Sequence, residues 1–265
     1  MTGRALAAFR AEVLKLATLP AAWVASSLSV VVPLALTALN SRTVRRALET
    51  GNEGDLASSS TVDSGFSDVA IGVIGPVILG VVAVSSEYVR SVSRLGGGRQ
   101  LATTMVSVPR RGRLIAAKLA ALTAWIACLA AISVPLTIVT FQRLVGPYAS
   151  ELDDVLTRGL GVGAYWLTMG LIAFALATAA RSGTIPLTFL LINASAVSLS
   201  LLLSRITSAV RFMPDVAWSY LTLRGDERPV SAAEPVEPAV AWLTLGCWAG
   251  AAVAASFLCF TRRDA

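Results

Sequence analysis

Six apolar blocks, each 18 to 26 residues long and free of charged side chains, follow one another along the sequence. A helix of about 20 apolar residues is long enough to cross the hydrocarbon layer of a bilayer. We expect an all-α polytopic membrane protein in which residues 1–265 form a single transmembrane domain. The pattern predicts six transmembrane helices, over residues 21–40, 69–86, 119–142, 159–180, 183–204 and 239–261.

The composition excludes a water-soluble protein and several classes of enzyme. Of the 265 residues, 55% are hydrophobic and 14% are charged, whereas about a quarter of the residues of a soluble domain are charged. The net charge of +6 is spread between the apolar blocks, so it does not indicate a nucleic-acid partner. The absence of histidine excludes Ser-His and Cys-His nucleophile pairs and the commonest metal ligand. We expect no cofactor in this chain, and we interpret Cys128, Cys247 and Cys259 as buried apolar thiols.

The basic residues between the blocks are unevenly distributed, and this predicts the orientation. Lys and Arg near the ends of spans favour the cytoplasmic side, whereas acidic residues have little effect. With the N-terminus inside, the inner segments hold 13 basic and 3 acidic residues, and the outer segments hold 9 basic and 13 acidic residues. We therefore expect a multi-pass protein of the bacterial inner (plasma) membrane with both termini in the cytoplasm.

The beginning of the chain predicts an amphipathic helix that lies on the inner leaflet before the first span. One helical side of residues 4–20 is apolar and is formed by Leu6, Phe9, Val13, Leu16 and Pro20. The other side carries Arg4, Glu12 and Lys15. An extension of the first span is the alternative, but Pro20 favours a break because proline disrupts a helix interior. A basic residue and a glycine within residues 181–183 predict a tight hairpin between two spans.

Residues 87–118 carry seven basic residues and are predicted to form the longest cytoplasmic loop between two spans. We interpret Gly96-Gly97-Gly98 as a flexible connector, because no Lys-Ser/Thr pair follows it as in a phosphate-binding loop. Residues 101–108 are long enough for about two helical turns, and Pro109 would end them. This short helix would present an apolar side to another surface. The alternative is a basic loop that only holds anionic lipid.

Two outer segments have contrasting compositions. Residues 205–237 mix apolar and charged side chains, and we expect one or two short helices, before and after Pro214, that dip into the outer interface. Trp218 and Tyr220 would then lie in the aromatic belt of the membrane. The segment around residues 51–65 is rich in Ser, Gly and Asp and is expected to be mobile.

Two motifs flank the cytoplasmic loop, Ser85-Ser86-Glu87-Tyr88 at the end of the second span and Val108-Pro-Arg-Arg-Gly-Arg113 before the third. These motifs resemble the membrane subunit of type 2 ATP-binding-cassette (ABC) exporters, especially the actinobacterial permeases. The N-terminal Phe9-Arg-Ala-Glu-Val-Leu-Lys15 run resembles the same family, which also places re-entrant extracellular helices before its last span. The chain departs from the family in the glycine-rich insertion between Glu87 and Thr104.

The resemblance implies a function, a set of partners and a set of coupling residues. A separate ABC ATPase subunit would dock on the loop helix and on the N-terminal helix, and ATP and Mg would bind to that partner. Two permeases, identical or paralogous, and two ATPases would form an exporter whose spans rock between inward-facing and outward-facing states. The coupling residues implied are Thr104, Met105, Val108, Arg110, Arg111 and Arg113. The alternative for the arginines is contact with lipid headgroups.

The spans lack charged residues near their middles, where such residues mark ion and proton routes. We therefore expect an uncharged path for lipids, hydrophobic drugs or amphipathic antibiotics. The resemblance places this path along the second and fifth spans, and the substrate contacts it suggests are Asn193, Ser195 and Ser198. Polar residues of this kind also join helices to one another, which is the alternative interpretation.

Glycines of the second span, Gly72, Gly75 and Gly80, are predicted to allow close helix approach. Three other functions stay open. The first is a self-sufficient secondary carrier or channel, and the second is a non-transporting accessory membrane protein. The third is a membrane-embedded enzyme, for which Asp153 and Asp154 are acidic candidates, although a solvated loop explains these two residues equally well.

Overall fold

The computed structural model describes residues 2–51, 61–88, 111–193, 200, 203–204, 206–224 and 236–263. Regular structure within these ranges is helical throughout. The helices are α1 (Thr2–Thr18), α2 (Pro20–Thr50), α3 (Thr61–Ala70), η2 (Ile71–Val73), α4 (Ile74–Tyr88), α6 (Arg111–Val145), η3 (Gly146–Tyr148), α7 (Val155–Ala180), α8 (Thr184–Asn193), η4 (Ser208–Phe212), α10 (Pro214–Thr222) and α11 (Pro238–Arg263).

Within the described residues, five helical segments are long and apolar enough to cross a membrane, which is the architecture of a multi-pass helical membrane protein. They are Pro20–Thr50, Thr61–Ser86, Gly112–Tyr148, Val155–Ala180 and Pro238–Phe260. Four of them contain a predicted span, and the last covers all but the final residue of the span 239–261, so five of the six predictions are confirmed as helices. The remaining predicted span, 183–204, is helical over α8, and most of its second half lies outside the described residues.

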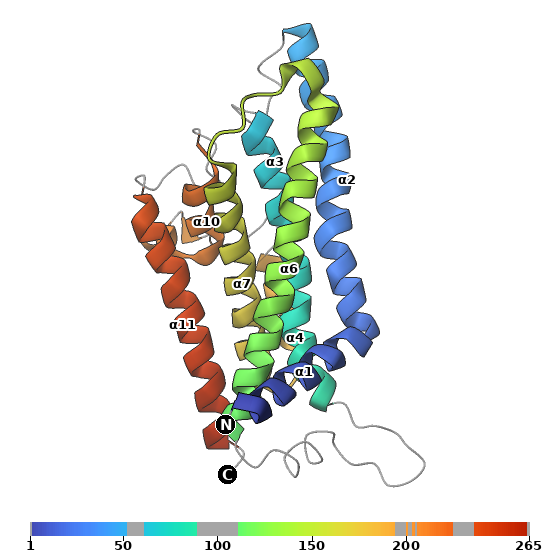
Figure 1. The fold of residues 1–265 in the computed structure, drawn as a ribbon. Coiled ribbons are helices and arrows are strands. Elements are labelled where there is room, and N and C mark those ends of the chain that lie inside the picture. The colour runs from blue at the N-terminus through green and yellow to red at the C-terminus, as the bar shows by residue number, and fades with distance from the viewer. Residues whose placement is uncertain are drawn as a thin grey trace.

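The long helices form a bundle whose two ends differ (Figure 1). α1 lies across the end that also holds the beginning of α6 and the end of α11, and we call it the α1 end. α3 and α10 lie toward the opposite end, which we call the α10 end. α7 occupies the centre of the bundle, since it packs against α4, α6, α10 and α11.

Three long helices begin several residues before the charge-free windows predicted for them. The second segment begins at Thr61, α6 begins at Arg111 and α7 begins at Val155. Each extension contains a charged residue whose side chain is buried inside the protein. The expectation of a mobile segment around residues 51–65 is therefore wrong for Thr61–Gly65, which is helical and has every residue buried.

The break between α1 and α2 confirms the prediction of a separate N-terminal helix. Leu19 has an extended backbone, with φ −83° and ψ 119°, and Pro20 is the first residue of α2. Proline is tolerated at this position because the first N–H of a helix has no intrahelical partner. The predicted hairpin is also present, because α7 ends at Arg181 in the left-handed conformation and α8 begins at Thr184.

The glycines of the second span let three helices pack closely, as predicted. A Cβ at Gly75 would lie 2.3 Å from the carbonyl oxygen of Ala25 in α2. A Cβ at Gly80 would lie 2.2 Å from the carbonyl oxygen of Gly170 in α7. Small residues of this kind allow helix backbones to approach one another in membranes, where van der Waals packing drives association. α4 is therefore held closely between α2 and α7.

The positions of two aromatic residues and of the cysteines differ from the predictions made for them. Trp218 and Tyr220 are buried within the protein instead of lying in an interfacial belt, because α10 packs against α7 and α11. The Trp218 ring stacks on Tyr165 of α7 with a centroid distance of 5.6 Å. The cysteines are free thiols on outward-facing sides of their helices, since Cys128 and Cys247 are exposed and Cys259 is half-buried.

Candidate functional site

α1 presents a partly apolar side to the bundle, and Glu12 lies on that side. Phe9 and Val13 pack against the core, and Leu16 is buried. Glu12 follows Phe9 by three residues and precedes Leu16 by four, so helical periodicity places all three on one side. The expectation that Glu12 belongs to the polar side of this helix is therefore wrong.

Glu12 forms a buried ion pair with Lys118 of α6. Nζ of Lys118 donates to Oε1 and Oε2 of Glu12 at 3.0 and 2.9 Å. Only 3% of the Lys118 side chain and 11% of the Glu12 side chain are exposed. The loss of one partner of such a pair leaves an uncompensated buried charge, which costs about 3–5 kcal/mol. The pair therefore joins α1 firmly to the beginning of α6.

Two of the predicted coupling residues, Arg111 and Arg113, lie in the first turn of α6, before Lys118. Arg111 is the first residue of α6, and the half-buried Arg113 lies five residues before Lys118. Five residues are about one and a half helical turns, so Arg113 and the ion pair are joined by a short length of helix. The other coupling residues, Thr104, Met105, Val108 and Arg110, lie outside the described residues.

The predicted substrate-path residues are placed only in part. Asn193 is the last residue of α8. Ser195 and Ser198 lie outside the described residues, so the substrate path along these three residues stays a prediction.

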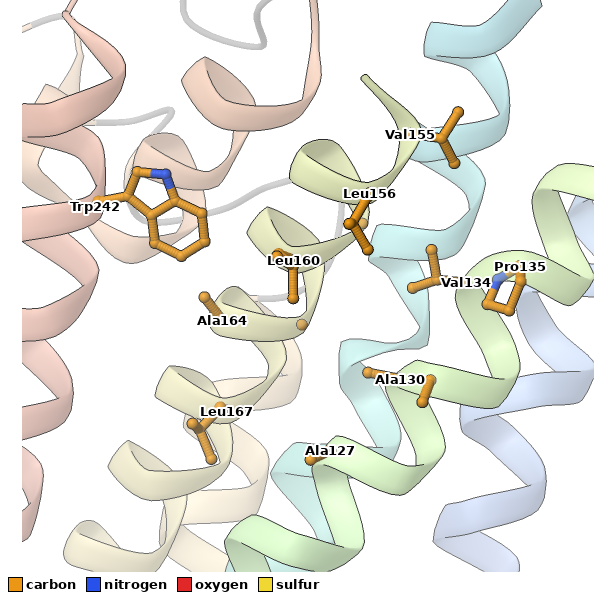
Figure 2. A pocket seen from close by; sticks show the side chains of 13 residues that line it. Ala127, Ala130, Val134, Pro135, Val155, Leu156, Leu160, Ala164, Leu167 and Trp242 are labelled. Carbon is orange, nitrogen blue, oxygen red and sulfur yellow. The ribbon is translucent and has the colours of Figure 1, made fainter. Parts of the chain in front are cut away.

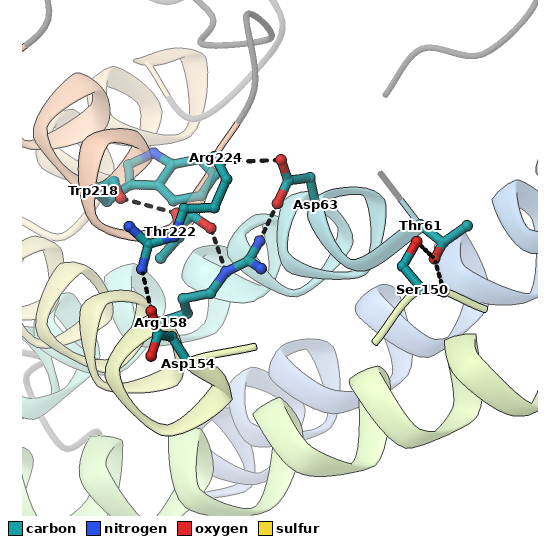
Figure 3. A network of polar contacts seen from close by, with 8 residues as sticks. All are labelled: Thr61, Asp63, Ser150, Asp154, Arg158, Trp218, Thr222 and Arg224. Atoms are coloured by element: carbon teal, nitrogen blue, oxygen red, sulfur yellow. Dashed lines mark hydrogen bonds and ion pairs between the residues drawn. The ribbon is translucent and has the colours of Figure 1, made fainter. Parts of the chain in front are cut away.

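A second buried ion pair lies at the α10 end of the bundle (Figure 3). Arg158 of α7 pairs with Asp63 of α3, and its Nε donates to the carbonyl oxygen of Thr222 in α10 at 2.6 Å. The guanidinium carbon also lies 4.4 Å from the centroid of the Phe66 ring. The side chains of Asp63 and Arg158 are only 1% and 3% exposed. One arginine therefore joins three helices.

Arg224 extends this network to the protein surface. Its backbone N–H donates to Asp63 at 3.0 Å, and its guanidinium pairs with Asp154 at 2.9 Å. The side chains of Arg224 and Asp154 are 49% and 65% exposed, so water weakens this outer pair. The exposure of Asp154 agrees with its interpretation as a solvated loop residue.

Sequence reasoning missed the Asp63–Arg158 pair because both residues lie just outside charge-free windows. The sequence nevertheless contained a signal for the burial of Asp63. Asp63, Phe66 and Ala70 recur at intervals of three and four residues, which is the spacing of one side of a helix. All three residues are buried in the structure.

A further carboxylate lies between α2 and α3. Asp68 is 2% exposed and accepts hydrogen bonds from Oγ1 of Thr37 at 3.0 Å and from Nδ2 of Asn40 at 2.5 Å. Thr37 and Asn40 are three residues apart on α2, so both reach the same side chain. Asp68 is the eighth residue of the segment Thr61–Ser86, which places it toward the α10 end of that span.

The described part of the chain contains no group of three or more Asp, Glu or Cys residues that could hold a metal ion. Neither a protein-family model nor a curated protein matches this sequence. The features of this chain that bear on its function are therefore the sequence motifs and the two buried ion pairs at opposite ends of the bundle.

Proposed function

We propose that this chain is the permease subunit of a type 2 ABC exporter and that a separate ABC ATPase subunit supplies the energy. The Glu12–Lys118 pair is the observation that carries the proposal, because it fixes α1 to the beginning of α6 beside Arg113. The two segments joined in this way are those whose sequences resemble the ABC permeases. A permease needs a firm joint at this point to convert the movement of a docked ATPase into movement of its spans.

In this proposal the α1 end faces the cytoplasm, as the distribution of Lys and Arg favours. The ATPase docks on residues 101–113 and on α1, and its closure displaces α1 and α6 together. α6 packs against α2, which in turn packs against α4, so the displacement spreads through the bundle. On the outer side, the Asp63–Arg158 pair keeps α3, α7 and α10 together.

The complete exporter contains a second permease, which is an identical copy or a paralogue, and two ATPase chains that bind ATP and Mg. The cargo is a hydrophobic or amphipathic molecule such as a lipid, a drug or an antibiotic. The absence of charged residues from the middles of the predicted spans supports this class of cargo.

Co-purification with an ABC ATPase from the same organism tests the proposal. We expect a stable complex whose ATP hydrolysis depends on the permease, and we expect scrambling of residues 101–113 to abolish both properties. Scrambling of residues 225–235, which belong to the opposite side of the membrane in this topology, is the matched control and should leave the complex intact. Unchanged assembly and hydrolysis with the scrambled 101–113 segment would contradict the proposal.

A self-sufficient secondary carrier is the second candidate, and the buried carboxylate of Asp68 favours it. Ionisable residues inside spans often belong to proton or ion routes. This candidate predicts that the purified chain, without ATP, moves cargo along an ion gradient and that Asp68→Asn abolishes the movement. Glu49→Gln, at an exposed carboxylate on α2, is the control. The ABC proposal predicts no movement by the chain alone.

A further inference from the structure

A groove between α6, α7 and α11 has no role in the coupling described above. Its volume is about 930 Å³, which lies within the range of ~300–1,000 Å³ found for small-molecule sites. Figure 2 shows Trp242 of α11 on one side and Val134 and Pro135 of α6 on the other, with Leu160 of α7 between them. We propose that this groove binds an acyl chain of a membrane phospholipid.

The lining of the groove matches an alkyl chain. Every described residue that lines the groove is Ala, Gly, Val, Leu, Pro or Trp, so this part of the chain offers no charged side chain to a ligand there. Small residues of α6 and α7, including Ala131 and Gly163, leave the space that the groove occupies. An apolar chain gains favourable dispersion contacts there, whereas an ion or a headgroup would lose its hydration without compensation.

The length of the groove along α7 matches the thickness of one leaflet of a bilayer. The lining residues of α7 run from Val155 to Leu167, a rise of about 18 Å at 1.5 Å per residue. Half of the hydrocarbon layer is about 15 Å thick. The exposed Asp154–Arg224 pair lies at the outer limit of the groove, since Asp154 directly precedes Val155. A zwitterionic headgroup there would meet charges of both signs.

The shape of the groove favours a lipid over a second copy of this chain. A helix with its side chains is about 10–12 Å wide, which gives a cross-section of about 80–110 Å². A groove of about 930 Å³ that runs for about 18 Å along α7 has a mean cross-section of about 50 Å². A single alkyl chain therefore fits the groove better than a helix does.

Photolabelling of the purified chain in phosphatidylcholine nanodiscs tests the proposal without an ATPase, so its outcome is separate from that of the transport proposal. The probe is phosphatidylcholine with a diazirine in the middle of one acyl chain, and labelled peptides are identified by mass spectrometry. We expect label to concentrate on the facing segments of α6 and α7. Ala131→Phe fills the groove and should remove this label.

Ala251→Phe is the matched control. Ala251 is exposed on α11 and lies nine residues after Trp242, so it points about half a turn away from the groove; this variant should keep the label. Gly163→Leu is a second filling variant, because its Cβ would meet Ala130 at an ordinary distance of 3.7 Å. Label on α2 as strong as that on α6 and α7, or label that persists in both filling variants, would overturn the proposal.

Discussion

The side chains of Lys118 and Arg158 illustrate how this protein keeps charges inside its helices. Each lies within the first eight residues of a long helix and pairs with a carboxylate from a helix distant in sequence. Without its carboxylate partner, the buried charge of either side chain would carry a large desolvation penalty. With its partner, Lys118 joins α1 to α6 at the α1 end of the bundle, and Arg158 joins α3, α7 and α10 at the α10 end.

Substitution of Lys118 tests the joint between α1 and α6. Lys118→Met leaves Glu12 buried without a cation, and we expect a loss of about 3–5 kcal/mol of stability, measured by thermal unfolding in nanodiscs. The double swap Glu12→Lys/Lys118→Glu should recover part of this loss. Arg45→Gln removes the exposed pair with Glu49 and should cost less than about 0.5 kcal/mol. Equal effects of the two single substitutions would argue against a buried joint.

Substitution of Arg158 tests the network at the α10 end. Arg158→Met removes the donor to Thr222 and the partner of Asp63, so we expect faster amide hydrogen exchange across α10. Arg224→Gln is the control, because it removes only the exposed pair with Asp154 and keeps the backbone N–H that contacts Asp63. Unchanged exchange in Arg158→Met would show that the ion pair does not hold α10 in place.

The two ion pairs also show which features could be predicted from the sequence and which could not. The charge-free windows correctly located five helices, but they placed Lys118 and Arg158 outside the spans. The search for charge-free windows excludes every charged residue, because a buried charge carries a desolvation penalty. An oppositely charged side chain from another helix offsets much of that penalty. The partner of Lys118 is 106 residues away and that of Arg158 is 95 residues away, so periodicity within one segment does not reveal either pair.

The helices themselves were easier to predict than their contacts. Pro20 ends the amphipathic segment because proline is compatible with the first turn of α2 and incompatible with a continuous helix. The glycines of the second span were correctly predicted to allow close approach. Their partners, Ala25 in α2 and Gly170 in α7, emerge only from the three-dimensional packing. The burial of α10 against α7 and α11 was missed for the same reason.

The packing of α4 against α2 predicts a strong effect of one methyl group. Gly75→Ala would place Cβ 1.8 Å from Oγ of Ser29 and 2.3 Å from the backbone oxygen of Ala25. The two helices must then separate, and we expect a marked fall in the unfolding temperature. In α11, the Cβ of Gly246→Ala would meet no packing neighbour within 4 Å among the described residues, so this variant should not lower that temperature. Similar values for the two variants would contradict the close contact.

The bundle as a whole has an orientation that labelling in intact cells can establish. In a background without Cys128, Cys247 and Cys259, Leu152→Cys should react with a membrane-impermeant thiol reagent, because it lies at the α10 end. Gly3→Cys, in α1, should react only after the membrane is permeabilised. Labelling of Gly3→Cys in intact cells would place α1 outside and exclude contact with a cytoplasmic ATPase.

The most direct test of the account is site-specific photo-cross-linking in living cells. A photoreactive amino acid at Thr104 should capture an ABC ATPase, identified by mass spectrometry, and the same group at Leu152 should not. This result is expected because residues 101–113 lead into α6, the helix that Lys118 joins to α1. Failure to capture an ATP-binding chain at Thr104, or equal capture at both positions, would contradict the proposal that an ATPase drives this chain from its α1 end.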